Sequence, residues 1–127
     1  MPLVRISLRE GTSAAYRLAI GDAVHRAMVE TINVPALDRF QLITEHPPEG
    51  LIYDSTYLSI KRTDEVIFVQ ITLNTGRSTD QKRALYRRMT ELLAESPGVQ
   101  PQNVLVSLVE VPRENWSFGE GKAQYAS

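Results

Sequence analysis

Three groups in this sequence could take part in a chemical reaction, and the first is the proline at position 2. A methionine that precedes a small residue is usually removed, which would leave Pro2 with a free secondary amine. An amine held at the start of a rigid strand can serve as a general acid or a general base. Proline makes up about 5% of average sequences, so Pro2 alone is better explained as an ordinary residue, and the other two groups are needed to support a catalytic role.

The second group is the carboxylate of Asp38, which lies at the junction between a predicted helix and a predicted strand. A side chain near a strand end is well placed for function, because loops carry many binding and catalytic residues. An aspartate shortly after a proline, here Pro35, also commonly caps backbone donors in a turn. The residues alone leave both interpretations open.

The third group is the guanidinium of Arg77, which stands in the run Asn74–Ser78 just before a predicted helix. The first turn of a helix attracts anions, and the planar arginine fork matches a carboxylate. The position therefore suits a small oxo acid as substrate. The alternative is a solvated arginine whose stem covers apolar surface.

The only tryptophan of the chain, Trp116, lies two positions before Phe118 and follows the last predicted strand. Aromatic residues at such a place can belong to the core or to a subunit interface. In a catalytic interpretation they form an apolar wall that keeps water away from the reacting carbons.

Other kinds of site have little support in the sequence. The chain has no cysteine, which excludes disulfides, thiolate metal sites and a cysteine nucleophile. His25 and His46 lack the spacing of metal ligands, so we expect no metal. The run 119–122 lacks the glycine spacing of a phosphate loop, and no serine–histidine–aspartate arrangement is evident.

Hydrophobic periodicity predicts the elements that must position these groups. A strand, an amphipathic helix and a second strand are followed by the same order again. The predicted strands cover 2–8, 39–44, 65–73 and 103–111, and the predicted helices cover about 13–32 and 78–96. The nearly continuous apolar run 65–73 predicts a central strand that is buried on both faces.

Each half of the chain, about 1–58 and 59–127, is therefore expected to form one β-α-β unit within a single domain of residues 1–127. The strands of such a unit normally pair in parallel through a right-handed crossover. Two units side by side predict an α/β (α+β) fold, a four-stranded sheet with two helices on one face. The other face would stay bare, so we expect other subunits to cover it in a closed ring.

The composition argues against several classes of function. The chain has 127 residues, 43% apolar side chains and a formal net charge of −1, and its basic residues are spread along it. No basic footprint for nucleic acid or an anionic membrane is evident. Neither a membrane-spanning run nor a secretion signal is recognisable. We therefore expect a cytoplasmic protein with neither nucleic acid nor membrane as partner.

Pro2, the duplicated β-α-β pattern and three further motifs resemble the malonate semialdehyde decarboxylase branch of the tautomerase superfamily. The motifs are the segment Val34–Arg39, the pair Gly76–Arg77 and the block Trp116–Gly119. The resemblance covers nearly the whole chain. It implies a duplicated β-α-β fold that assembles as a homotrimer, with the amino-terminal proline at the base of a pocket.

The resemblance also implies a reaction that needs no cofactor. Pro2 would be cationic, Asp38 would assist the amine, and Arg77 would hold the carboxylate of the substrate. Trp116 and Phe118 would line the substrate site. The implied reaction is the decarboxylation of malonate semialdehyde or a similar short 3-oxo acid.

The loop before the second predicted helix departs from the family pattern. Well-known members carry two arginines there in an Arg-Pro-Arg run, whereas this chain reads Asn-Thr-Gly-Arg at positions 74–77. Only Arg77 carries over, which leaves the substrate carboxylate with one anchor fewer.

Two other functions stay open. A phenylpyruvate-type keto-enol tautomerase, or a hydratase, would act on 2-oxo acids. In the tautomerase Pro2 would be neutral and would move a proton between carbon and oxygen. The third hypothesis is a non-catalytic oligomeric binding protein, because a fold does not fix a function. Retention of Met1 would favour this third hypothesis.

Overall fold

The structure is a computed structural model that describes residues 2–126. The predicted removal of Met1 therefore lies outside the described residues. The main elements in chain order are β1 (Leu3–Arg9), α1 (Ala14–Thr31), β2 (Gln41–His46), β3 (Ile67–Asn74), α2 (Thr79–Glu95) and β4 (Val104–Val111). Each predicted helix and strand is present, with ends that differ from the prediction by no more than two residues.

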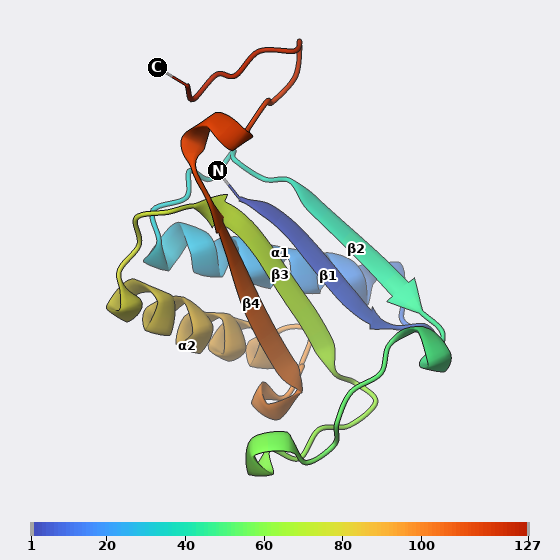
Figure 1. Ribbon diagram of the computed structural model, residues 1–127. Coiled ribbons are helices and arrows are strands. Elements are labelled where there is room, and N and C mark those ends of the chain that lie inside the picture. Colours follow the sequence, from blue (N-terminus) through green and yellow to red (C-terminus); the bar gives the residue numbers. More distant parts are fainter. Residues whose placement is uncertain (1, 127) are drawn as a thin grey trace.

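The four strands form one sheet in the order β2-β1-β3-β4. Each β-α-β half pairs its own two strands in parallel, and the halves join through the antiparallel pair β1 and β3. Both helices lie on the same face of this sheet (Figure 1). The predicted fold class, a four-stranded sheet with two helices on one face, is thereby confirmed.

The core lies between the sheet and the two helices. Strand β1 contributes Val4, Ile6 and Leu8, and alternate residues of β3 face the same way. The prediction that β3 is buried on both faces is wrong for the single chain. Phe68 is half-buried and Gln70 is exposed, because these side chains point away from the helices and no other layer of this chain covers them.

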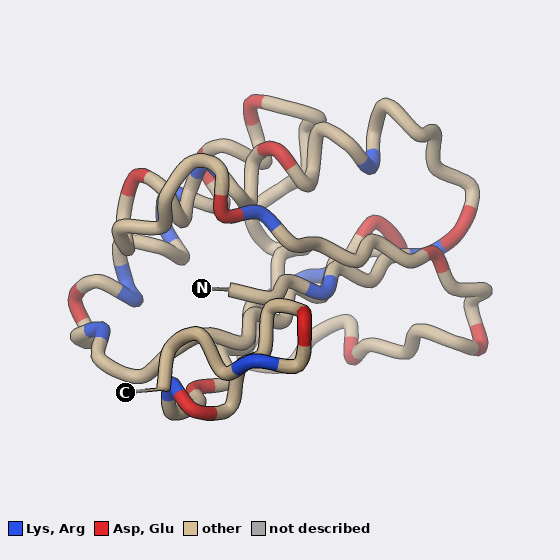
Figure 2. The backbone as a smooth tube through the Cα atoms, turned by 90° about the horizontal axis from the view of Figure 1, so that it is seen from above, with Lys and Arg blue, Asp and Glu red and all other residues tan. Residues whose placement is uncertain are grey.

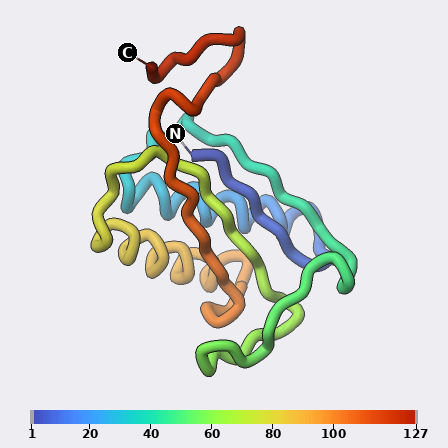
Figure 3. The backbone as a smooth tube through the Cα atoms, viewed as in Figure 1, coloured from blue at the N-terminus to red at the C-terminus, as the bar shows by residue number. Residues whose placement is uncertain are grey.

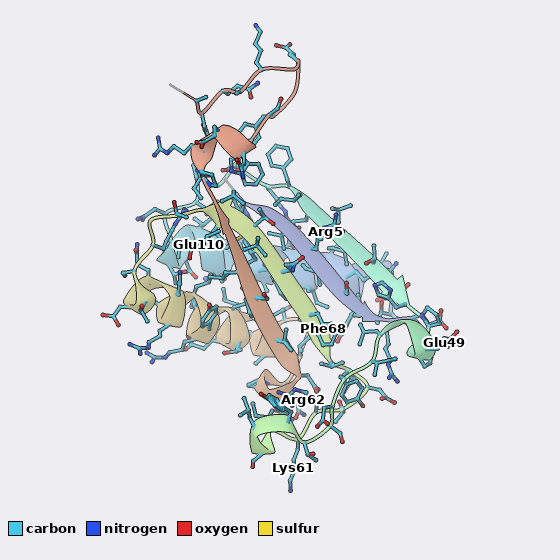
Figure 4. All side chains as sticks on the ribbon, in the orientation of Figure 1. Arg5, Glu49, Lys61, Arg62, Phe68 and Glu110 are labelled. Carbon is cyan, nitrogen blue, oxygen red and sulfur yellow. The ribbon has the colours of Figure 1, made fainter. Side chains whose placement is uncertain are left out.

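We call the helix-free side of the sheet the open face. Its residues mix apolar and polar side chains: Leu42 and Leu105 are 46% and 42% exposed, and Arg5 pairs in register with Gln70 between them. Arg5 and Phe68 are labelled on this face in Figure 4. Exposed apolar side chains on a sheet face that no helix covers are typical of a subunit contact.

The strand directions bring distant parts of the chain together. Strands β1 and β2 begin where β3 and β4 end, and we call this edge of the sheet the proline end. The segment after β4, drawn red in Figure 3, lies at the proline end next to the start of β1. We call the opposite edge, where β1 finishes, the Arg9 end.

Charged residues of both signs alternate along the chain rather than gathering on one element (Figure 2). Between residues 2 and 126, no helix has the length and apolar character needed to cross a membrane.

Candidate active site

Pro2 is buried directly before β1, at the proline end. The backbone N–H of Val4 donates to the carbonyl of Phe40 at 3.0 Å, and Leu3 pairs with Thr72 of β3. When the two strand pairings are extended to position 2, Pro2 lies between Arg39, in the segment before β2, and Leu73 of β3. The residue whose amine is predicted to be catalytic is therefore held by neighbouring segments on both sides.

Asp38 lies in the segment that joins α1 to β2. Its backbone N–H donates to the carbonyl of Pro35 at 3.0 Å, which fixes a turn. Burial raises the pKa of the Asp38 carboxyl above its ordinary value, whereas the positive charges of the amino terminus and of His25 act to lower it. The pairing of β1 with β2 extends to Pro2 opposite Arg39, so Asp38 lies in the segment beside Pro2.

His25 is a neighbour of Asp38 that the sequence analysis set aside. It lies on α1 with only 8% of its surface exposed, and its Nε2 is 2.8 Å from the carbonyl oxygen of Ala36. Its Nδ1 is buried and makes no hydrogen bond within the described chain. A titratable side chain on the core-facing side of an amphipathic helix is the signal that could have identified it.

Arg77 is half-buried, and two backbone carbonyls hold its guanidinium in place. One Nη donates to the carbonyl of Asn74 at 3.3 Å, and the other donates to the carbonyl of Ile32 at 3.1 Å. The turn that allows this needs Gly76, whose φ of +129° belongs to the region that favours glycine. Arg77 is therefore not the fully solvated arginine of the alternative interpretation.

Arg77 lines a cavity of about 510 Å³ at the proline end, which we call the arginine cavity. The cavity is formed by the end of α1, the loop and first turn of α2, and the segment after β4. Its other lining residues are Ile32, Asn33, Asn74, Thr75, Gly76, Gln81, Arg113 and Tyr125. Sequence analysis did not identify Arg113 and Tyr125, because they meet Arg77 only through the fold.

The two aromatic candidates lie beside this cavity. The indole Nε1 of Trp116 donates to Oδ1 of Asn74 at 2.7 Å, which ties the segment after β4 to the end of β3. The Trp116 and Phe118 rings stack at 5.4 Å, and Phe118 meets the edge of Tyr125 at 4.9 Å. An aromatic wall therefore reaches the arginine cavity through Tyr125.

The structure brings the predicted residues to one end of the sheet but divides them between two positions. Pro2 and Asp38 lie at the β1–β2 side, and Arg77 lies in the arginine cavity, whose lining includes neither of them. The two positions are close in the sheet. Pro2 lies opposite Leu73 of β3, and the next residue, Asn74, lines the arginine cavity. In the described part of the chain, no cluster of histidine and carboxylate residues could hold a metal ion.

Two family models, both described as tautomerase enzyme, match residues 2–59 and 38–119. The probable tautomerase YusQ of Bacillus subtilis (strain 168) is 40% identical over 98% of each chain. This chain belongs to the tautomerase superfamily. The resemblance seen in the sequence is thereby confirmed.

Solved structures of superfamily members share this fold. Two crystal structures of malonate semialdehyde decarboxylase superpose with a TM-score of 0.91, and both align with 97% of this chain. One is 34% identical and aligned over 95% of its length, and the other, inhibited by 3-bromopropiolate, is 38% identical over 93%. A fused 4-OT symmetric trimer, 21% identical, has a TM-score of 0.78 and aligns over 97% of each chain, which shows the fold alone.

Proposed function

We propose that this tautomerase-superfamily enzyme decarboxylates malonate semialdehyde or a similar short 3-oxo acid, with the Pro2 amine as its catalytic group once Met1 is removed. The observation that carries the proposal is that the pairing of β1 with β2 places the buried Pro2 beside the segment that carries Asp38. The similarity of 34% and 38% to malonate semialdehyde decarboxylase over nearly the whole chain supports the same reaction.

In the proposed reaction the bond between the carboxylate carbon and the α-carbon breaks. Carbon dioxide leaves, and the electron pair of that bond moves toward the carbonyl oxygen as an enolate. A cationic Pro2 stabilises this charge by a hydrogen bond to the carbonyl oxygen. In the alternative route the amine gives up its proton and condenses with the carbonyl to an iminium with loss of water; the iminium accepts the electron pair as an enamine, and water hydrolyses it after protonation of the carbon. Protonation of the α-carbon then gives the aldehyde, so no oxidant or reductant is needed.

Arg77 is assigned to the carboxylate of the substrate before it leaves. Its guanidinium has five N–H donors, of which the bonds to Asn74 and Ile32 use two. The remaining donors can bind an oxyanion in a fixed direction. Trp116 and Phe118 are assigned to the wall that excludes water from the site.

We also propose that the protein works as a homotrimer. The exposed apolar side chains of the open face, including Leu42, Leu105 and Val109, support a subunit contact there. The shared fold with a fused 4-OT trimer is consistent with the same assembly. Native mass spectrometry at micromolar concentration tests it, and a monomer would contradict it.

A keto-enol tautomerase that acts on 2-oxo acids is the second candidate. It is favoured by the 40% identity to a probable tautomerase over 98% of the chain. The same cavity and arginine would bind a 2-oxo acid, but the amine would have to be neutral in order to accept a proton. The two functions therefore differ in the protonation state of one group.

The test supplies the purified protein with malonate semialdehyde and, separately, with the enol of phenylpyruvate. Release of carbon dioxide from the first and ketonisation of the second are measured for the native protein and for Pro2→Ala. We expect decarboxylation that Pro2→Ala reduces by about a hundredfold or more. Ketonisation without carbon dioxide release would select the tautomerase, and an unchanged Pro2→Ala variant would remove the amine from the mechanism.

A further inference from the structure

The arginine cavity carries an unusual balance of charge. Two of its nine lining residues, Arg77 and Arg113, are cationic, and none of the nine is an aspartate or a glutamate. The carboxylate of Glu110, at the end of β4, is already bound by the Nζ of Lys82 at 2.7 Å. A concave site with charge of one sign attracts small ligands of the opposite sign.

Arg113 differs from Arg77 in how its side chain is used. It begins the short turn Arg113–Asn115, and within residues 2–126 its guanidinium makes no hydrogen bond or ion pair. Arg5 and Arg87 also have no such partner in the described chain, but neither of them lines this cavity. Arg113 is therefore the lining cation whose donors are all available to a ligand.

The backbone below Arg113 is held firmly although the side chain is exposed. The N–H of Asn115 donates to the carbonyl of Pro112 at 3.1 Å, and the N–H of Trp116 faces the carbonyl of Arg113 at 3.4 Å. The indole of Trp116 is in turn anchored to Asn74, another lining residue. The turn thus fixes the backbone of Arg113, from which the side chain extends to line the cavity.

We propose that Arg113 is a second substrate-binding cation, which lines the arginine cavity together with Arg77 and binds the anionic end of a short oxo acid. This assignment rests on the proposed function for the identity of the ligand. It explains how a chain with a single arginine in the loop 74–77 can still present two cations to a carboxylate. A volume of about 510 Å³ lies in the usual range for small-molecule sites.

Binding of malonate, an unreactive dicarboxylate of similar size, tests the assignment without requiring turnover. The fluorescence of Trp116, the only tryptophan, serves as the readout because its indole contacts a lining residue. We expect Arg113→Gln to raise the Kd for malonate about tenfold or more. The matched control is Arg87→Gln, an exposed arginine outside the cavity, which should change the Kd less than twofold.

A second variant distinguishes a lost contact from a damaged site. Thr75 lines the same cavity next to Arg77, so Thr75→Arg in the Arg113→Gln background should restore at least part of the affinity. Unchanged malonate affinity in Arg113→Gln, or no saturable binding by the native protein, would overturn the assignment.

The assignment and the proposed function fail in different ways. If Arg113→Gln loses malonate binding while the native protein releases no carbon dioxide from malonate semialdehyde, the binding role stands and the decarboxylase does not. If the native protein is a decarboxylase and Arg113→Gln keeps its KM and its malonate affinity, the reaction stands and the role of Arg113 is wrong.

Discussion

The cavities at the two ends of the sheet differ in how their lining arginines are bound. At the Arg9 end, Arg9 donates to Asp64 at 3.0 Å and to the carbonyl of Leu51, and Arg17 pairs with Glu45 at 3.1 Å. In the arginine cavity at the proline end, the Arg77 side chain bonds only to neutral carbonyls, and the Arg113 guanidinium has no hydrogen bond or ion pair within residues 2–126. Outside this cavity, Arg39 at the same end pairs with Asp22 at 2.8 Å.

This difference distinguishes arginines that stabilise the fold from arginines that are available to bind a ligand. An arginine that is bound by a carboxylate has its charge compensated within the chain and stabilises the fold. The arginines in the arginine cavity have no carboxylate among the lining residues, so their charge is left for a ligand. Both ends have a concave surface, since a cavity of about 410 Å³ lies beside Arg9. Shape alone therefore does not distinguish the proposed active site from the cavity beside Arg9, whereas the charge of the lining residues does.

The largest effect is expected at Asp38. Asp38→Asn removes the carboxylate that is assigned to support the Pro2 amine, so kcat should fall by about a hundredfold with little change in KM. Glu45→Gln at the Arg9 end is the control and should leave kcat unchanged. Steady-state kinetics with the oxo acid substrate measures both, and equal kcat values for the two variants would refute the contrast between the ends.

A smaller effect is expected for Arg77→Gln, because this residue is assigned to binding rather than to turnover. The loss of a charge-assisted contact should raise KM by roughly ten- to a hundredfold, with kcat less affected. The variant also loses bonds to the carbonyls of Asn74 and Ile32, so its Tm should fall. A variant with lower Tm but native KM would return Arg77 to a purely structural role.

Arg9→Gln should show the opposite behaviour. The ion pair with Asp64 is exposed on the aspartate side, so its loss, together with the bonds to Leu51, should cost about 1 to 2 kcal/mol. Thermal denaturation would then show a Tm lower by a few degrees, while kcat/KM stays native. A marked loss of kcat/KM would show that the Arg9 end takes part in catalysis.

The smallest effects concern pH, and they have opposite signs at the two ends. Hydrogen bonds from the Thr12 side chain and backbone lower the pKa of the Glu45 carboxyl, whereas burial raises that of Asp38. The contribution of Glu45 to stability is therefore present above its ordinary pKa and is lost as pH falls. The contribution of Asp38 is present below its ordinary pKa and is lost as pH rises through the raised value.

Calorimetry of matched variants measures this difference. Between about pH 3 and pH 7, the Tm difference between native protein and Glu45→Gln should grow as pH rises. The corresponding difference for Asp38→Asn should shrink over the same interval. The same trend for both variants would mean that the two carboxyl groups have similar environments.

Both α-helices and all four strands were predictable from the sequence because periodicity is a local signal, whereas the short 3-10 turns were not predicted. The apolar run 65–73 misled in one respect, since it does not show that one sheet face has no helix above it. Arg77 was recognisable because a glycine, an arginine and a capping serine follow one another before α2. Arg113, Tyr125 and His25 had no such local pattern, since their positions relative to the site depend on contacts between segments far apart in the chain.

The pKa of the Pro2 nitrogen tests the central claim most directly. The negative charge of Asp38 favours the cation, whereas burial and the positive charge of Arg77 favour the neutral amine. We expect the carboxylate to prevail and Pro2 to be largely cationic at pH 7, as the decarboxylase requires. Intact mass first establishes that Met1 is absent, and isotope-edited NMR titration of the proline nitrogen then gives the pKa. A value above the ordinary α-amino range of about 8 is the predicted result, and a value below about 7 would contradict the decarboxylase and select the tautomerase.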